Sequence, residues 1–317
     1  MKILVLGAGA IGGFYGGHLL AAGRDVTFLV RARRATQLAK RGLDIESAEG
    51  NLHINNPPAV LAEEIKTHFD LVLVSCKAYD LPNAIESFSA AVGPNTVILP
   101  LLNGMYHLKL LDDRFGKNKV LGGKCFISAA LSADGRVLHL NDADRLTLGE
   151  RDGSLSTRVQ QIADALGNAG FAVEVSRKIL QDMWQKWVFI AAAAGSASLM
   201  GGSVGDMVAA GADGIALSLL QECASVAESE GFPPSTAFLE ATRSQLTAAG
   251  STLIPSMLRD IDHNAPIETE TIIGDMFRRG SAHGLSLELL EIVYARLRCY
   301  EIRRAAAAAS LSTTQPE

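Results

Sequence analysis

The sequence predicts two domains, an α/β domain followed by a domain built only of helices. Its 317 residues suit two domains of about 150 residues each. The first half alternates short apolar runs with helical stretches, which is typical of a parallel sheet covered by helices on both faces. From about residue 178 the pattern is helical. We therefore expect one domain over 1–177, a second over 178–305, and a flexible low-complexity tail over 306–317.

Four apolar runs of strand length in the first domain are expected to form this parallel sheet. They are Ile3–Leu6, Val26–Val30, Leu71–Ser75 and Val97–Leu101. A helix over Gly13–Ala22 links the first two runs, and Gly23 supplies its C-terminal stop.

Antiparallel strands are expected after the parallel ones. Asp134-Gly135 is a hairpin signal between the runs Cys125–Leu131 and Val137–Leu140. Arg145–Leu148 continues this region, and Phe171–Val175 is expected to be its last edge strand. The second domain is expected to contain helices over Trp184–Met200, Leu217–Glu230, Thr236–Ala248, Thr269–Arg279 and Leu287–Arg304.

Composition and charge exclude several classes of protein. Charged residues are 20% of the chain and its net charge is −5, so the basic footprint of a nucleic-acid binder is missing. No run approaches about 18 uninterrupted apolar residues, which argues against a transmembrane helix. The apolar start Met1–Leu6 breaks at once into glycines, so we expect no secretion signal. The four cysteines lack zinc-ligand spacing and are expected to be free thiols in a reducing cytoplasm.

A glycine motif predicts a dinucleotide cofactor. Residues 7–12 read Gly-Ala-Gly-Ala-Ile-Gly, a GxGxxG pattern between a strand and a helix at the start of the chain. In this context Gly7 permits the tight turn, Gly9 lets the backbone approach a pyrophosphate, and Gly12 lets the helix pack on the strand. The helix N-terminus, with the backbone of Ala8, Ala10 and Ile11, then faces the phosphates. The alternative is a glycine turn that packs a helix and binds nothing.

Arginines at the end of the second strand favour NADP(H) over NAD(H). Binders of NAD usually carry an acid at this position to bind the ribose hydroxyls. Here Val26–Val30 is followed by Arg31, then Arg33 and Arg34, with no Asp or Glu at that edge. A guanidinium suits a 2′-phosphate, and Arg31 is the first candidate. The alternative is a run of arginines in a solvated loop.

Three further polar residues are candidates for the site of a nicotinamide-dependent carbonyl reductase. Such an enzyme must orient its substrate and protonate the new alkoxide. Lys186 lies in a strongly apolar helix, either extended to solvent or held there for catalysis. Asn103 and Lys77 each follow a strand at the carboxyl edge of the sheet, where ligands bind in such folds. Asn103 also suits an Asn-Gly turn, and Lys77 also suits solvent exposure.

These residues belong to an ordered set of motifs by which residues 1–305 resemble the ketopantoate reductases (2-dehydropantoate 2-reductases). The last two motifs look like the family's S-M-x-x-D and P-x-E-x-D/E signatures. The set comprises the N-terminal GxGxxG, Cys76-Lys77-Ala78, Leu102-Asn103-Gly104, Trp184-Gln185-Lys186, Ser256-Met257-Leu258-Arg259-Asp260 and Pro266-Ile267-Glu268-Thr269-Glu270.

The resemblance implies an N-terminal Rossmann domain, an all-helical C-terminal domain and a possible homodimer. It implies that Lys186 is the general acid and that Glu268 lies near the cofactor and this lysine. It also implies that Ser256 binds the substrate carboxylate and that Asn103 touches both cofactor and substrate. Cofactor contacts are implied for Lys77, Arg31 and the backbone of Ala129 or Ala130. Ser256 as a helix cap and Glu268 as a solvated acid at a helix start remain alternatives.

The chain departs from the family pattern on the helix that carries the lysine. The family pattern is K-x-x-x-N-x-x-x-N, whereas Lys186 is followed by Ile190 and Ala194 on the same helix face. An apolar face cannot hydrogen-bond the oxygens of ketopantoate, unless Ser196, Ser198 or Ser203 compensates. We therefore expect NADPH-dependent reduction of ketopantoate to pantoate in pantothenate biosynthesis. The alternatives are a reductase of a more apolar 2-oxo acid and an NADP(H)-binding protein without catalysis.

Overall fold

The computed structural model describes residues 1–313, and for residues 309–313 it describes the backbone only. The chain divides into two compact units, the first covering Met1–Met183 and the second beginning at Trp184. The division falls within helix α6 (Ile179–Met200), a few residues after the expected boundary at residue 177. Within the described residues, no helix is both long enough and apolar enough to cross a membrane.

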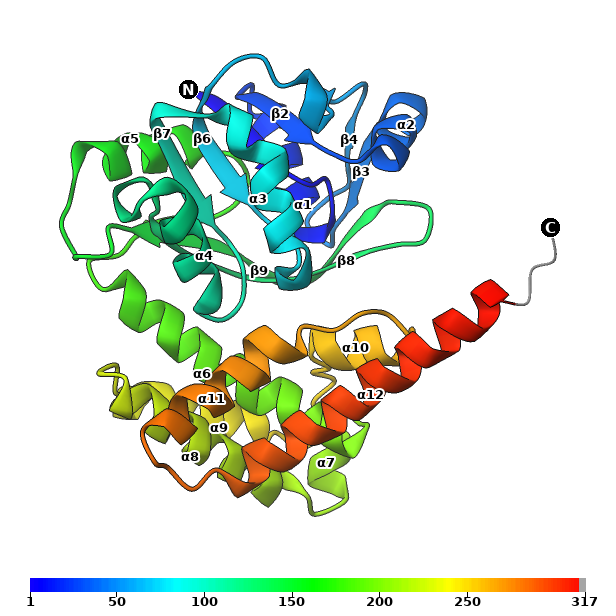
Figure 1. The fold of residues 1–317 in the computed structure, drawn as a ribbon, viewed down its shortest axis with the longest axis vertical. Helices are drawn as coiled ribbons and strands as arrows, with labels where there is room; N and C mark the ends of the chain where they lie inside the picture. Colours follow the sequence, from blue (N-terminus) through cyan, green and yellow to red (C-terminus); the bar gives the residue numbers. More distant parts are fainter. Residues whose placement is uncertain (314–317) are drawn as a thin grey trace. The chain divides into compact units, whose positions relative to one another are not determined.

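A five-stranded parallel sheet forms the centre of the first unit (Figure 1). Its order is β5-β2-β1-β6-β7, and all four expected strands are present in it with slightly different ends. The fifth strand, β5, has only two residues, too few to show an apolar or alternating pattern in the sequence. The strands are β1 (Lys2–Leu6), β2 (Asp25–Leu29), β5 (Ala59–Val60), β6 (Phe69–Val74) and β7 (Val92–Pro100).

The chain order reverses at β1, which lies between β2 and β6. In open parallel sheets this reversal opens a crevice at the carboxyl ends of the strands, where ligands bind. Helix α1 (Ala10–Ala21) leaves β1 at this point and is followed, after β2, by α2 (Ala32–Arg41). The other helices and 3-10 turns of this unit are η1 (Ala62–Glu64), η2 (Ala78–Asp80), α3 (Leu81–Phe88), η3 (Ser89–Ala91), α4 (Tyr106–Phe115), η4 (Lys117–Lys119) and α5 (Thr157–Leu166).

A second sheet carries the expected hairpin. Strands β8 (Gly122–Leu131) and β9 (Val137–Gly149) are antiparallel, as predicted, and β9 includes the expected strand Arg145–Leu148 without a break. The edge strand β10 (Val173–Val175) pairs with β9 and is also confirmed. The order continues through β3 (Leu43–Glu46) to β4 (Leu52–Ile54), two short strands that the sequence reading missed.

Helix α1 packs against both sheets through its glycines. A Cβ at Gly16 would lie 2.5 Å from the ring of Phe28 in β2, and a Cβ at Gly17 would lie 2.6 Å from Ile45 in β3. The first unit therefore buries one apolar core around α1, which includes Phe14, Tyr15 and Leu19.

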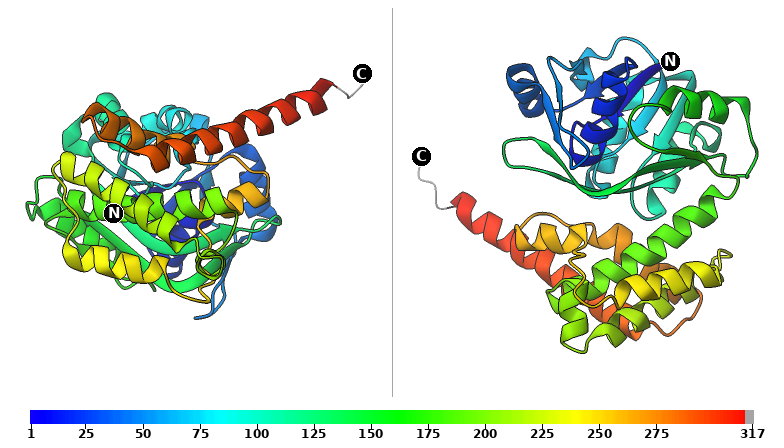
Figure 2. Two further views of the ribbon diagram at one scale, coloured as in Figure 1. Left: turned by 90° about the horizontal axis from the view of Figure 1, so that it is seen from below. Right: turned by 180° about the vertical axis from the view of Figure 1, so that it is seen from behind.

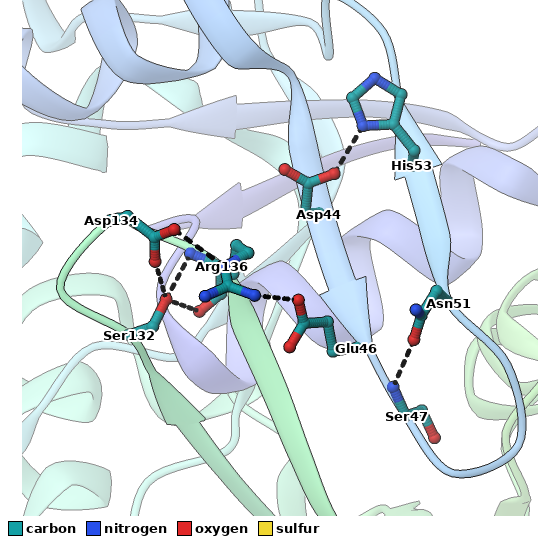
Figure 3. Close-up of polar contacts among 8 residues, drawn as sticks. All are labelled: Asp44, Glu46, Ser47, Asn51, His53, Ser132, Asp134 and Arg136. Carbon is teal, nitrogen blue, oxygen red and sulfur yellow. Dashed lines mark hydrogen bonds and ion pairs between the residues drawn. The ribbon is translucent and has the colours of Figure 1, made fainter.

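Polar contacts fasten the hairpin to β3 (Figure 3). The Arg136 guanidinium forms ion pairs with Glu46 of β3 and, over 2.9 Å, with Asp134 in the hairpin turn. The Ser132 hydroxyl donates to the Asp134 carboxylate over 2.6 Å, which orders the turn that Asp134-Gly135 predicted.

The second unit is helical throughout its described residues (Figure 2). All the expected helices are present, but the one expected over Thr269–Arg279 is divided into a π-helical turn and α11. The short helices α7 and α10 were not predicted. The elements after α6 are α7 (Val204–Ala209), α8 (Asp213–Ser229), α9 (Thr236–Leu246), α10 (Ser256–Asp262), η5 (Glu270–Gly274, π-helical), α11 (Asp275–Ala282) and α12 (Glu288–Thr313).

The last helix continues beyond its expected end at Arg304. The segment 306–317, expected to be a flexible tail, begins inside α12, because the alanines after Arg304 favour helix strongly. Residues 314–317 lie outside the described residues.

In the described part of the chain none of the four cysteines forms a disulfide, as expected. Cys125 and Cys223 are buried, Cys76 is half-buried and Cys299 is exposed.

Candidate functional site

The glycine loop has the geometry that the motif predicts. Gly7 has φ +87°, a conformation that L side chains rarely adopt, so the tight turn requires glycine. A Cβ at Gly12 would collide with the Gly7 carbonyl oxygen and the Ser75 hydroxyl, so α1 approaches the sheet only because this residue is glycine. A Cβ at Gly9 would meet nothing within 4 Å. The middle glycine therefore faces open space, where a ligand can approach the backbone.

The start of α1 is free to bind an anion. Gly9 is the N-cap residue, and within the described part of the chain no side chain caps the helix and no acid lies in its first turn. Ala8 is buried, whereas Ala10 and Ile11 are half-buried. Free N–H groups and the positive end of the helix dipole bind phosphate well. The loop from Gly7 to Gly12 thus fits the pyrophosphate of a dinucleotide.

Arg31 occupies the N-cap position of α2, directly after β2 and Val30. Its side chain is 77% exposed, and its Nη2 lies 2.8 Å from Asp80 Oδ1 in η2. The hydrogen bond that Arg31 donates to Asp80 raises the pKa of Arg31. Because β1 separates β2 from β6, this ion pair reaches across the carboxyl end of β1. The guanidinium is accessible to a ligand, but a phosphate would have to share it with the Asp80 carboxylate.

Arg34 also belongs to the site, although the sequence analysis selected Arg31 as the first candidate. Its Nε donates to the carbonyl oxygen of Ala8 over 3.0 Å, and its Nη1 donates to Gln37 over 3.3 Å. Burial lowers the pKa of Arg34, and its Nη2 is buried without a hydrogen bond in the described residues. Arg34 therefore stabilises the glycine loop through its hydrogen bond to the Ala8 backbone. Arg34 lies three residues after Arg31, and this spacing places both on one helix face. That spacing could have indicated Arg34 as a second candidate.

Lys77 and Asn103 follow β6 and β7 at the carboxyl edge of the parallel sheet, where the glycine loop follows β1. Lys77 is the N-cap residue of η2 after β6, and Asn103 follows β7; both are half-buried. Gly104 has φ +79°, so the Asn-Gly turn is real and the position of Asn103 is compatible with both interpretations. Ala129 lies in β8 opposite His139, beside a shift in strand register, and Ala130 lies opposite Leu138.

The other candidate residues lie in the second unit. Lys186 and Ile190 are half-buried on α6, and Ala194 is 4% exposed. Ser256 is the first residue of α10, whose N-cap residue is Pro255 without a capping side chain, so the interpretation of Ser256 as the helix cap is wrong. Glu268 is 8% exposed, so the interpretation as a solvated acid is wrong as well.

The serines proposed to replace the missing asparagines are differently engaged. The Ser196 hydroxyl donates to the carbonyl oxygen of Ala192 over 2.7 Å. The Ser203 hydroxyl caps α7 and donates to Asp206 over 2.6 Å. The Ser198 hydroxyl is buried without a hydrogen bond in the described residues. Of the three hydroxyls, only that of Ser198 is unused.

Comparison with known proteins covers both units. The family model described as "Ketopantoate reductase PanE/ApbA" matches residues 3–153, and the model described as "Ketopantoate reductase PanE/ApbA C terminal" matches residues 178–301. An uncharacterized oxidoreductase, YkpB of Bacillus subtilis, is 36% identical over 305 residues, which cover 96% of this chain and all of that protein.

Solved structures agree over the same length. The 2-dehydropantoate 2-reductase of Methylococcus capsulatus is 30% identical, with a TM-score of 0.82 over 96% of this chain and 98% of that one. A ternary structure of D-mandelate dehydrogenase with NADH and anilino(oxo)acetate has a TM-score of 0.87 at 21% identity, over 96% of this chain and 100% of that one. The second likeness shows a shared fold.

Proposed function

The chain belongs to the ketopantoate reductase family of oxidoreductases, and on that premise we propose that it reduces 2-dehydropantoate (ketopantoate) to pantoate with NADPH. The observation that carries the proposal is that the family models match both units of one chain, over ranges that include the glycine loop, Lys186 and Glu268. We further propose that it acts in the cytoplasm, in pantothenate biosynthesis, on a small-molecule 2-oxo acid, and as a homodimer.

The first unit is proposed to bind the cofactor. The loop from Gly7 to Gly12 and the N-terminus of α1 would hold the pyrophosphate, and Arg31 would hold the 2′-phosphate. Lys77, Asn103 and the backbone at Ala129 are proposed as further cofactor contacts. Bound NADPH would supply the hydride to the carbonyl carbon of the substrate.

The second unit is proposed to supply the proton and to hold the substrate. Lys186 donates a proton to the carbonyl oxygen as it becomes an alkoxide, and Glu268 is proposed to lie near this lysine and the cofactor. The hydroxyl of Ser256 donates a hydrogen bond to the substrate carboxylate, and Asn103 contacts the substrate as well as the cofactor. The rate then depends mainly on holding the reacting atoms at attack distance.

Ile190 favours a second candidate, the reduction of a more apolar 2-oxo acid. It lies one helical turn beyond Lys186 and is half-buried, so part of its side chain is accessible to a ligand. A site that offers no partner to a buried hydroxyl disfavours a hydroxylated substrate, because that hydroxyl loses its hydrogen bonds to water.

A substrate panel tests both candidates. Purified protein is mixed with NADPH and either ketopantoate or 2-oxo acids with apolar side chains, and NADPH absorbance is followed. A kcat/KM for ketopantoate that exceeds the others supports the first candidate. A higher value for an apolar acid replaces the first candidate with the second. Tight NADPH binding without turnover of any substrate overturns both and leaves an NADP(H)-binding protein without catalysis.

A further inference from the structure

A chain of two buried hydrogen bonds joins α6 to the backbone of Glu268. Trp187 is 0% exposed, and its Nε1–H donates to the carbonyl oxygen of Ile272 over 2.9 Å. The N–H of Ile272 donates in turn to the carbonyl oxygen of Glu268 over 3.0 Å. The residue directly after Lys186 is thereby connected to the backbone of Glu268.

The acceptor of this bond lies in an irregular part of the helix. Ile272 belongs to the π-helical turn η5, in which the N–H of Asp275 bonds to the carbonyl oxygen of Glu270, five residues earlier. A π-turn inserts an extra residue into the hydrogen-bond ladder, and such turns occur often at functional sites.

Close packing brings α6 against its neighbours. A Cβ at Gly195 of α6 would lie 2.6 Å from Leu219 in α8 and 3.5 Å, an ordinary van der Waals distance, from Ile273 Cδ1 in η5. The missing side chain therefore allows α6 to approach α8, and Ile273 of η5 lies beside the same position.

A cation fixes the orientation of the indole. The Arg279 guanidinium lies 5.8 Å from the ring centre of Trp187 and 5.7 Å from that of Trp184. Arg279 is itself held by Asp275 over 3.1 Å and by Glu230 over 2.5 Å. The indole N–H is thus directed at its acceptor by a half-buried and paired group.

We propose that Trp187 is a positioning residue that sets the placement of Lys186 relative to Glu268 through its hydrogen bond to Ile272. This inference rests on the roles proposed above for Lys186 and Glu268. Trp187 does not touch the substrate; it fixes the two segments that carry the proton donor and its carboxylate. A displacement of about 1 Å between groups that must act together lowers a catalytic rate by as much as about 100-fold.

Trp184 provides a matched control. It lies three residues away on α6, is 2% exposed, has its ring centre 4.8 Å from that of Trp187 in a tilted arrangement, and contacts the same Arg279. In the described part of the chain its indole N–H makes no hydrogen bond. Trp184→Phe and Trp187→Phe therefore remove the same atoms from similar surroundings, and only Trp187→Phe removes the hydrogen bond.

The experiment compares kcat and KM for the two variants, with Lys186→Ala as the test of the underlying function. We expect Trp187→Phe to lower kcat about tenfold, with KM for the 2-oxo acid and NADPH affinity unchanged, and Trp184→Phe to stay within about twofold of the unmodified protein. Equal kcat values for the two variants overturn the inference. If Lys186→Ala keeps full turnover, the proposed function fails first, and the positioning role fails with it.

A second measurement covers the case in which Trp187→Phe does not fold. The chain has two tryptophans, so Trp184→Phe leaves Trp187 as the single indole. Replacing that indole by β-(3-benzothienyl)-alanine keeps the ring shape and removes the N–H. In Trp184→Phe, before this replacement, the nitrogen-bound proton of the Trp187 indole should exchange slowly with solvent when observed by NMR. Slow exchange and a tenfold loss of kcat on replacement support the inference, and fast exchange or unchanged kcat overturns it.

Discussion

Replacing Arg31 by alanine should weaken binding of NADPH and leave binding of NADH almost unchanged. A guanidinium about 4 Å from a phosphate of roughly −1.5 charge gains about 1.5 kcal/mol at a dielectric constant of about 80. Direct charge-assisted hydrogen bonds add to this gain. Sharing the guanidinium with Asp80 subtracts from it, by at most about 1 kcal/mol for an exposed ion pair. The net loss of about 1–2 kcal/mol corresponds to a roughly 5- to 30-fold weaker Kd for NADPH.

Arg33 offers a control for this experiment, because it carries the same charge two residues further on and is exposed. At a distance of about 10 Å, which is one Debye length at about 0.1 M salt, its removal should change NADPH affinity less than twofold. The assay is titration of purified Arg31→Ala, Arg33→Ala and unmodified protein with both cofactors, followed by nicotinamide fluorescence or calorimetry.

Two results would refute the assignment of Arg31 to the 2′-phosphate. The first is an equal loss of NADPH and NADH affinity, which indicates that Arg31 supports the fold or the adenosine instead. The second is a loss in Arg33→Ala as large as that in Arg31→Ala, which indicates a diffuse positive field. The difference between the two variants should also shrink in about 1 M salt, where the Debye length falls to about 3 Å.

Four other substitutions have directional outcomes. Lys186→Ala should lower kcat by about 10²- to 10⁴-fold with unchanged NADPH affinity, and unaltered turnover would exclude a general acid there. Gly12→Ala should lower the free energy of unfolding by about 1–3 kcal/mol, measured by denaturant titration, because the added Cβ would meet backbone. Gly9→Ala should keep the free energy of unfolding unchanged and weaken cofactor binding, which cofactor titration measures. Arg158 donates to Glu150 over 2.7 and 2.6 Å and lowers the pKa of Glu150. Glu150→Gln should therefore cost about 1–3 kcal/mol near pH 7. This cost should disappear as the pH falls below the unfolded value of about 4.3 and through the lower folded pKa; a cost that persists at low pH would contradict the role of charge.

The fold was predictable wherever a segment carried its own periodic signal. Strands β1, β2, β6 and β7 each contain a buried apolar run, and Asp134-Gly135 marked the hairpin. Helix α2 escaped prediction because four of its ten residues are basic and only Leu38 is buried, so its apolar face is narrow. The π-turn also has no sequence signal, because a single inserted residue looks like a continuous helix.

The candidate site was predictable only where the chemistry is local in sequence. The GxGxxG spacing encodes a turn, a close approach and a helix start within six positions, and the structure has all three. The support of the glycine loop by Arg34 joins residues 26 positions apart, and the bond from Trp187 to Ile272 joins residues 85 positions apart. Such contacts depend on the packing of whole elements, which no spacing rule contains.

The geometry of α6 limits which of its side chains can contact a substrate bound at Lys186. At about 1.5 Å per residue, Ile190 lies about 6 Å along the helix from Lys186, and Ser198 lies about 18 Å away. The unused hydroxyl of Ser198 is thus too distant to bind a small 2-oxo acid whose carbonyl contacts Lys186. Ser196 and Ser203 already bond within their own helices. A substrate hydroxyl placed against Ile190 would lose a hydrogen-bond partner, which costs about 1–3 kcal/mol of binding free energy. An apolar group in the same place would gain about 25 cal/mol for each Å² of apolar surface that it buries. Selectivity between the two classes of 2-oxo acid should therefore reach about one to two orders of magnitude in kcat/KM.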